Sequence, residues 1–427
     1  MGSDGMNEAP FDKGTQSAGK DVPSRLGRVF PALEEPDFRV LWFGMLPGIL
    51  AMQMYFFVNG YFAFELTGAA SSIGAISLGF GLPMLIFSLA GGMTADRHSK
   101  LRILIITQVV LAAGALVMAL LVLTGLITLW QMVVLSAIMG TAFTFHMPAR
   151  QSFVAEVVSA PRLMNAIALG GAALNGSRVL GPPLAGVMIG VTWIGVGGVY
   201  AIMAAMFVLV FISFFRLREP PGRIDKEGVT GYRAMIDGIS YIRHSPVLPV
   251  LLALSLAPII LGLPYQALMP VFAKNVFNVG PGGLGVLMMA NGMGALAGSL
   301  VIASLRRLRS PGLVQLALGM LFGLSLIVFS RIENYQAAMV VLFFVGAVSA
   351  GYLALNASLI MEKTEKRYHG RVMSIYMLTF SALPLGNMFI SLLADAFGAP
   401  ATIGVGGILL AGIVFLFGSF SRAYRNM

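Results

Sequence analysis

Residues 92–102 read Gly92-Met93-Thr94-Ala95-Asp96-Arg97-His98-Ser99-Lys100-Leu101-Arg102, a short charged connection between apolar segments at about 70–94 and 103–124. Each of these segments is long enough to cross about 30 Å of hydrocarbon as a helix. The stretch therefore predicts two membrane-spanning helices joined by a polar turn that stays in water.

The same alternation of apolar segments and polar connections runs along most of the 427 residues, of which 57% are hydrophobic and only 11% are charged. A soluble domain carries about 25% charged residues. The apolar runs are continuous rather than alternating, which favours helices over barrel strands. We predict twelve spanning helices, at about 38–64, 70–94, 103–124, 127–147, 167–190, 196–216, 248–272, 283–305, 313–329, 336–360, 373–394 and 401–420.

Lys and Arg are distributed unevenly between the two sides of such a membrane. Of the 28 Lys and Arg residues, all but three fall on one side; Lys274 and Arg331 lie on the other, and Arg178 lies inside a segment. Basic residues concentrate in cytoplasmic connections, so both termini are expected in the cytoplasm. Because these residues are dispersed at membrane ends, the net charge of +10 does not indicate a nucleic-acid partner.

The longest connection divides the twelve segments into six and six. Such parallel halves are typical of one class of secondary transporters. The predicted organisation is a largely disordered cytoplasmic tail over 1–37, a six-helix bundle over 38–216, a central cytoplasmic loop with an amphipathic helix over 217–247, a second six-helix bundle over 248–421, and a cytoplasmic tail over 422–427.

Two motifs resemble the major facilitator superfamily. The stretch 92–102 resembles that family's loop between its second and third helices, from which Ser99 and Leu101 depart. The second motif resembles the fifth-helix signature of the family's exporters, which the family associates with antiport. It reads Arg178-Val179-Leu180-Gly181-Pro182-Pro183-Leu184-Ala185-Gly186, in which Arg178, Gly181, Pro182 and Gly186 carry the resemblance.

Three shorter stretches resemble the drug-exporter branch that includes bacterial macrolide and siderophore exporters. They are Glu65-Leu66-Thr67-Gly68, Pro148-Ala149-Arg150-Gln151 and Gly370-Arg371-Val372-Met373-Ser374. The resemblance implies an all-α, multi-pass monomer in the cytoplasmic (inner) membrane of a bacterium. It also implies alternating access, export of a small lipophilic molecule, and a proton as the coupling ion.

The resemblance further implies a conformational latch on the cytoplasmic face. Asp96 would contact Arg371 just before the eleventh apolar segment, and Arg97 would reach Glu156. A carboxylate is also stabilised at the positive end of a helix dipole. The alternative is that these are ordinary loop charges, which contribute little. The candidate latch residues are Gly92, Asp96, Arg97, Lys100, Glu156 and Arg371.

Arg178 requires an explanation of its own, because a cation at mid-bilayer costs roughly 2.5–3.5 kcal/mol on insertion scales. Asn175 and Pro182 share its helix face. The guanidinium either faces a central cavity or donates to carbonyls of a neighbouring helix beside the Pro182 kink. The candidate cavity residues, each of which could instead serve helix packing, are Gln53, Phe57, Asn175, Arg178, Asn291, Tyr376 and Asn387.

None of the 18 acidic residues lies in the middle of an apolar segment. The resembling exporters often carry an Asp in the first helix, where this chain has Met52. The remaining proton-coupling candidates are Glu65 and Asp395 near the outer face, Asp96 and Glu156 near the inner face, and His146. The histidine could simply bond to backbone or water at a helix end. A cavity with one Arg and no central acid would favour neutral or anionic amphiphiles over cationic drugs.

The sequence also argues against other classes of protein. It has no Cys, four His and no paired acids inside the membrane, so we expect no catalytic set, no metal site and no cofactor. No nucleotide-binding loop is present, which argues against direct use of ATP. Two alternatives stay open: an importer or uncoupled facilitator of a neutral or anionic small molecule, and a membrane scaffold or signalling protein without transport.

Overall fold

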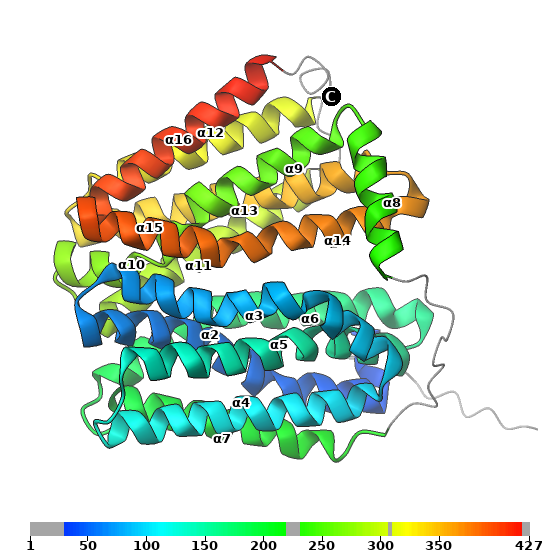
Figure 1. Cartoon of the computed structure of the whole chain (residues 1–427), viewed down its shortest axis with the longest axis horizontal. Helices are drawn as coiled ribbons and strands as arrows, with labels where there is room; N and C mark the ends of the chain where they lie inside the picture. Colours follow the sequence, from blue (N-terminus) through cyan, green and yellow to red (C-terminus); the bar gives the residue numbers. More distant parts are fainter. Residues whose placement is uncertain (1–29, 219–230, 306–309, 421–427) are drawn as a thin grey trace, which may run out of the picture.

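The computed structural model describes residues 30–218, 231–305 and 310–420, which are helical and contain no strand. The helices form two bundles, drawn as the lower and upper halves of Figure 1. The first bundle consists of α2 (Pro36–Thr67), α3 (Ala70–Arg97), α4 (Lys100–Leu123), α5 (Leu129–Val157), α6 (Leu163–Gly190) and α7 (Gly195–Phe214).

The second bundle also contains six membrane-spanning elements, two of which are broken into shorter pieces. The first is α9 (Leu248–Ala257), η3 (Pro258–Gly262), η4 (Leu263–Gln266), α10 (Met269–Val271) and η5 (Phe272–Val276). The others are α11 (Pro281–Ser304), α12 (Pro311–Phe329), α13 (Tyr335–Glu362), then α14 (His369–Thr379) with η7 (Phe380–Ala382) and α15 (Leu383–Phe397), and α16 (Ala399–Phe420). Short turns precede α2, α6 and α14: η1 (Pro31–Glu34), η2 (Ala160–Arg162) and η6 (Lys366–Tyr368).

Eleven of these elements in the described residues are long and apolar enough to cross a membrane. The remaining one is α6, whose 28 residues suffice in length. Its hydropathy is reduced by Arg178, two Asn residues and the Pro182-Pro183 pair. The predicted all-α fold with two six-helix bundles is therefore confirmed, and α6 is the least apolar of its spanning elements.

Prolines explain where the second bundle departs from the continuous helix expected over 248–272. Pro258, Pro264 and Pro270 lack a backbone N–H, so each removes one hydrogen bond of the α-helical ladder. The chain passes these positions through a π turn and a 3₁₀ turn instead of an unbroken helix. A similar break at η7 precedes Pro384.

Helix α5 is longer than the sequence suggested. The segment was expected to end near residue 147, but the helix continues through Pro148 to Val157. An end at residue 147 would place Arg150 in the polar connection that follows the segment. That expectation is wrong, because Arg150 lies inside α5. A proline removes one hydrogen bond but does not by itself end a helix that is held by tertiary packing.

The last part of the expected tail packs against the first bundle. Ala32 is fully buried, and its backbone N–H donates to Asn165 Oδ1 at 3.1 Å. Arg162 pairs with Glu34 and Glu35 at 2.7 and 3.0 Å. The other parts of the two tails and of the central loop, residues 1–29, 219–230 and 421–427, lie outside the described residues.

One further helix, α8 (Gly231–His244), lies across one end of the second bundle (Figure 1). Its Tyr241 ring stacks on Tyr368 with the ring centroids 4.1 Å apart. We call this end of the molecule, where α3 and α5 end and α14 begins, the α8 end, and the other the far end. The bundles meet where α3 packs against α15 and α6 packs against α11.

Candidate functional site

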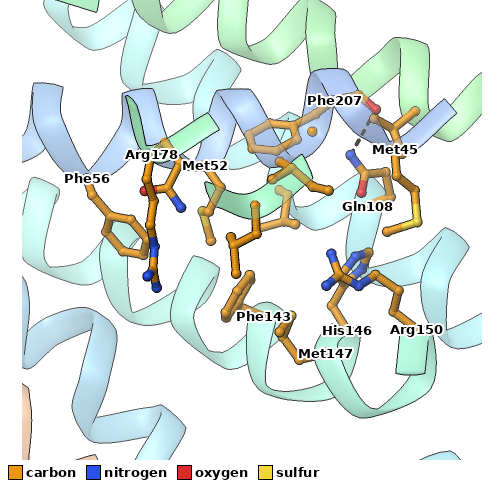
Figure 2. A pocket seen from close by; sticks show the side chains of 16 residues that line it. Met45, Met52, Phe56, Gln108, Phe143, His146, Met147, Arg150, Arg178 and Phe207 are labelled. Carbon is orange, nitrogen blue, oxygen red and sulfur yellow. Dashed lines mark hydrogen bonds between the residues drawn. The ribbon is translucent and has the colours of Figure 1, made fainter. Parts of the chain in front are cut away.

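A cavity of about 250 Å³ lies within the first bundle, between α2, α4, α5, α6 and α7 (Figure 2). Most of its wall is apolar, and the polar contributions come from two guanidinium groups, one imidazole and two amides. No Asp or Glu belongs to this described lining. The lining residues are Met45, Gly48, Ile49, Met52, Gln53, Phe56, Gln108, Leu111, Phe143, His146, Met147, Arg150, Leu174, Arg178, Phe207 and Val210.

Arg178 reaches this cavity from the middle of α6, and Figure 2 shows its side chain beside Phe56. The side chain is exposed rather than packed between helices. Within the described part of the chain, no carboxylate or backbone carbonyl forms an ion pair or hydrogen bond with its guanidinium. Arg178 is therefore available to a ligand in this conformation.

His146 and Arg150 lie one helical turn apart on α5 and approach each other at the other end of the cavity in this view (Figure 2). His146 is only 6% exposed, and its Nδ1 lies 3.0 Å from Thr107 Oγ1. Thr107 Oγ1 also lies 2.8 Å from the Ile103 carbonyl oxygen and 3.1 Å from the Leu104 carbonyl oxygen, both of which can accept its hydroxyl hydrogen. No described group pairs with the guanidinium of Arg150.

Sequence reasoning missed Arg150 as a cavity residue because it assigned the residue to a loop. The spacing of His146 and Arg150 was the available signal, since side chains four residues apart share one helix face. Gln108 was also missed; its Nε2 donates to the Phe207 carbonyl at 3.0 Å, the dashed line of Figure 2.

Of the seven residues predicted for a substrate cavity, Gln53 and Arg178 line this one, together with Met52. The other five are Phe57, Asn175, Asn291, Tyr376 and Asn387, and they lie outside its lining. Asn291 donates to the Tyr265 hydroxyl and to the Leu342 carbonyl within the second bundle. Its amide therefore links helices of that bundle in this conformation.

Asn387 lies at the contact between the bundles, whereas Tyr376 and Asn175 form no hydrogen bond to the cavity residues among the described side chains. Asn387 Nδ2 donates to Ser77 Oγ at 3.3 Å across the contact between α15 and α3. Tyr376 is buried and meets Phe380 edge-on, with the ring centroids 5.4 Å apart. Asn175 is half-buried on α6.

The glycines of the α6 motif allow helices to approach closely. A Cβ at Gly181 would lie 2.7 Å from Gln53 Cβ on α2. A Cβ at Gly186 would collide with the Pro281 carbonyl oxygen at the start of α11, and Phe57 lies close by. Gly181 therefore serves packing within the first bundle, whereas Gly186 serves the contact between the bundles.

At the far end, two polar contacts join the bundles. The Asp395 carboxylate at the end of α15 accepts the backbone N–H groups of Ala70 and Ser71, at 2.6 and 2.9 Å, and so caps the N-terminus of α3. Lys274 pairs with Glu65 at 2.9 Å. Together with the bond from Asn387, these are the hydrogen bonds and ion pairs that link the bundles in the described residues.

The α8 end has no corresponding closure. Asp96 and Arg97 are exposed, and nothing lies within 4 Å of a Cβ placed on Gly92. Arg371 contacts Asp237 of α8 at 3.5 Å instead of Asp96. The predicted latch across this end is therefore not formed in this conformation.

The expected pairing of Glu156 with Arg97 is absent as well, because Lys100 at the start of α4 binds Glu156 at 2.6 Å. Lys100 begins the helix that packs directly against α5, so its ammonium group reaches the end of α5 within the same bundle. The described residues contain no group of three or more His, Asp and Glu side chains that could hold a metal ion.

Comparison with known proteins places the chain among membrane transporters. The sequence model of a family described as transmembrane secretion effectors matches residues 28–423. Macrolide efflux protein A of Streptococcus pyogenes is 22% identical over 84% of this chain and 90% of its own length. The staphyloferrin A transporter of Staphylococcus aureus is 24% identical over 81% and 86%, and the multidrug efflux pump Tap of Mycolicibacterium fortuitum is 26% identical over 82% and 88%.

Solved structures show the same fold at lower sequence identity. A bacterial homologue of the human lysosomal transporter Spinster, in an inward-facing and unoccupied conformation, matches with a TM-score of 0.70 and 13% identity over 91% of this chain and 95% of that chain. The nucleoside transporter NupG matches with a TM-score of 0.69 and 12% identity over 91% and 99%. At this level of identity the likeness concerns the arrangement of the helices alone.

Proposed function

The chain belongs to the transmembrane secretion effector family of the major facilitator superfamily, and on that basis we propose that it exports lipophilic small molecules by proton-coupled alternating access. It is a multi-pass transporter of the bacterial cytoplasmic membrane and not an enzyme. The observation that carries the proposal is a cavity of about 250 Å³ inside one of two bundles. The Asp395 cap and the Lys274–Glu65 ion pair join these bundles at the far end.

The distribution of Lys and Arg supports a cytoplasmic location for the α8 end, where both termini would then lie. In this conformation the far end, which would face outward, is the closed one. The arrangement corresponds to a transporter that receives its substrate from the cytoplasm. Closing the α8 end and opening the far end would complete the export step.

Two Asp residues suggest how the closures could alternate. Helix α3 runs opposite to the spanning element formed by α14, η7 and α15. The C-terminal end of α15 therefore lies near the N-terminal end of α3, and the C-terminal end of α3 lies on the side where α14 begins. Asp395 at the end of α15 already caps α3. Asp96, one residue before the end of α3, is the matching group for the start of α14, where Arg371 lies. We propose that rocking of the bundles exchanges the first closure for the second.

Support for an exported lipophilic substrate comes from the relatives and from the cavity wall. The relatives' names refer to macrolides, to staphyloferrin A and to multiple drugs. The cavity wall contains Met45, Met52 and Met147 as well as aromatic rings. Flexible thioether side chains adapt to ligands of different shape, which suits an exporter with broad specificity.

A proton is the proposed coupling ion. The side chains that could carry it lie at the far end and in the cavity. Asp395 and Glu65 hold the far end closed, so a proton on either carboxylate would remove a negative charge from that closure. His146 lines the cavity. Met52 lines the same cavity without any group that titrates, and this favours an uncoupled facilitator as the second candidate function.

The direct test is transport by purified protein in liposomes, using neutral, anionic and cationic lipophiles under an imposed pH gradient. Gradient-driven movement of a panel compound is the expected result. Movement that does not depend on the pH gradient would contradict the proton-coupled exporter and support the uncoupled facilitator. If no compound moves while the protein is folded and correctly inserted, a scaffold or signalling role becomes the better account.

Asp96→Asn is expected to reduce transport at least severalfold at an unchanged protein level, because the amide lacks the charge that would face the start of α14 once the α8 end closes. Arg331→Gln is a control for a charge change in a connection that lies outside the latch. Comparable rates for Asp96→Asn and the unaltered protein would remove Asp96 from the mechanism.

A further inference from the structure

We propose that the cavity of the first bundle is a binding site for anionic amphiphiles, with Arg150 and Arg178 as the groups that bind the acidic head. This inference rests on the proposed transport function and names the class of substrate. The chemistry shared by such ligands is a carboxylate, sulfonate or phosphate attached to a compact apolar body.

The balance of charge around the cavity carries the argument. Two guanidinium groups and one imidazole line it, and the five helices around it contribute no carboxylate to the described lining. Of the acids at the α8 end of the first bundle, Glu156 is bound to Lys100, and Glu34 and Glu35 to Arg162. Asp96 is exposed and lies outside the lining of the cavity. A charge held at membrane depth without a counter-charge is unfavourable. An anionic ligand would supply the missing counter-charge.

The positions of the two arginines suit entry from the cytoplasm. Arg150 lies about two turns, or ~10 Å, before the end of α5 at the α8 end. Arg178 lies deeper, in the middle of α6. An anion that enters from the α8 end would therefore meet Arg150 first, and Arg178 offers a second cation further along the same cavity.

The apolar body of the ligand would lie between the two arginines. Figure 2 shows Met52 and Phe143 between Arg178 on one side and the His146–Arg150 pair on the other. The volume, about 250 Å³, falls just below the ~300–1,000 Å³ usual for small-molecule sites. It suits a one- or two-ring body rather than a large macrocycle.

The same arrangement disfavours cations. A ligand ammonium group would enter a wall that holds two positive charges and no described carboxylate. Repulsion of this kind is an effective source of specificity, because it penalises the wrong ligand without requiring close contacts to the right one.

The test is equilibrium dialysis of the purified chain, in a neutral maltoside detergent, against three probes with the same naphthalene body. The probes are naphthalene-1-acetate, 2-(1-naphthyl)ethanol and 2-(1-naphthyl)ethylamine. We expect the acetate to bind at least tenfold more tightly than the alcohol and the amine to bind most weakly. Equal binding of acetate and alcohol, or tighter binding of the amine, would overturn the proposal even without a variant.

Variants then locate the site. The single carboxylate of a bound probe contacts one arginine at a time. At least one of Arg150→Gln and Arg178→Gln should therefore lower the affinity for the acetate about tenfold and change that for the alcohol less than twofold, because only the acetate uses the charge-assisted bond. Arg150→Lys should keep most of the preference for the acetate. Arg331→Gln, which removes one exposed charge at the far end, should have no effect.

The outcomes separate this site from the transport function. Equal losses for Arg331→Gln and Arg150→Gln would show a general charge effect and refute the site. Selective acetate binding without any movement in liposomes would keep the site and refute the exporter. Transport of neutral or cationic probes with no acetate preference would keep the exporter and refute the site.

Discussion

Replacing Gly186 with Val is expected to lower export at least tenfold and to shift the protein toward a conformation that is open at the far end. A Cβ at this position would collide with the Pro281 carbonyl oxygen, a backbone atom at the start of α11. Overpacking costs about 1–3 kcal/mol when neighbours cannot move cheaply. This free energy acts on the closed far end, so the ratio of the two conformations should change roughly fivefold to 150-fold.

The same helix offers a matched control. Gly190 ends α6 one turn later, and nothing lies within 4 Å of a Cβ placed there. Gly190→Val introduces the same side chain without the collision, so its export rate should stay close to that of the unaltered protein. If both variants lose export equally, the cause is a general loss of folding or insertion and not the contact between the bundles.

Asp395→Ala is expected to open the far end by a second route. The carboxylate accepts two backbone N–H groups from the first turn of α3, and it carries the charge that a helix N-terminus attracts. Loss of a helix cap costs about 1 kcal/mol, or roughly a fivefold change in the ratio of conformations. Accessibility of a reporter cysteine at the far end to a membrane-impermeant thiol reagent would measure this change.

Glu65→Ala is the graded comparison for that experiment. It removes the ion pair with Lys274, in which both side chains are close to half exposed. Exposed ion pairs contribute about 0–1 kcal/mol, so Glu65→Ala should open the far end less than Asp395→Ala does. An equal or larger effect of Glu65→Ala would show that the ion pair, and not the helix cap, holds the closure.

The fold could be predicted from sequence because lipid imposes a simple rule. Segments that cross the hydrocarbon must be long, apolar and helical, and eleven of the spanning elements in the described residues meet this rule, with α6 as the less apolar one. Element ends were less predictable. Pro148 is a common signal for the end of a helix, yet α5 continues to Val157. Tertiary packing overrides such local signals, and the position of Arg150 was wrong for that reason.

The site was harder to predict, because sequence shows which polar groups lie at membrane depth but not which of them face each other. Arg178 was recognised because a charged side chain at mid-bilayer is unfavourable in free energy, and it lines the cavity. Asn291 was chosen on the same grounds, but it bonds to Tyr265 within the second bundle. The role of Asp395 as a helix cap depends on two elements that are 325 positions apart in sequence, a contact that no local pattern reveals.

The central claim, that the two ends open and close reciprocally, can be tested most directly by electron–electron distance measurements on spin labels. The chain has no Cys, so label pairs can be introduced without removing native thiols. Suitable exposed positions are Leu126 with Glu333 at the far end and Ala160 with Lys366 at the α8 end. The account predicts that Asp395→Ala lengthens the far-end distance and shortens the α8-end distance. Both distances changing in the same direction, or the α8-end distance staying fixed while the far end opens, would contradict it.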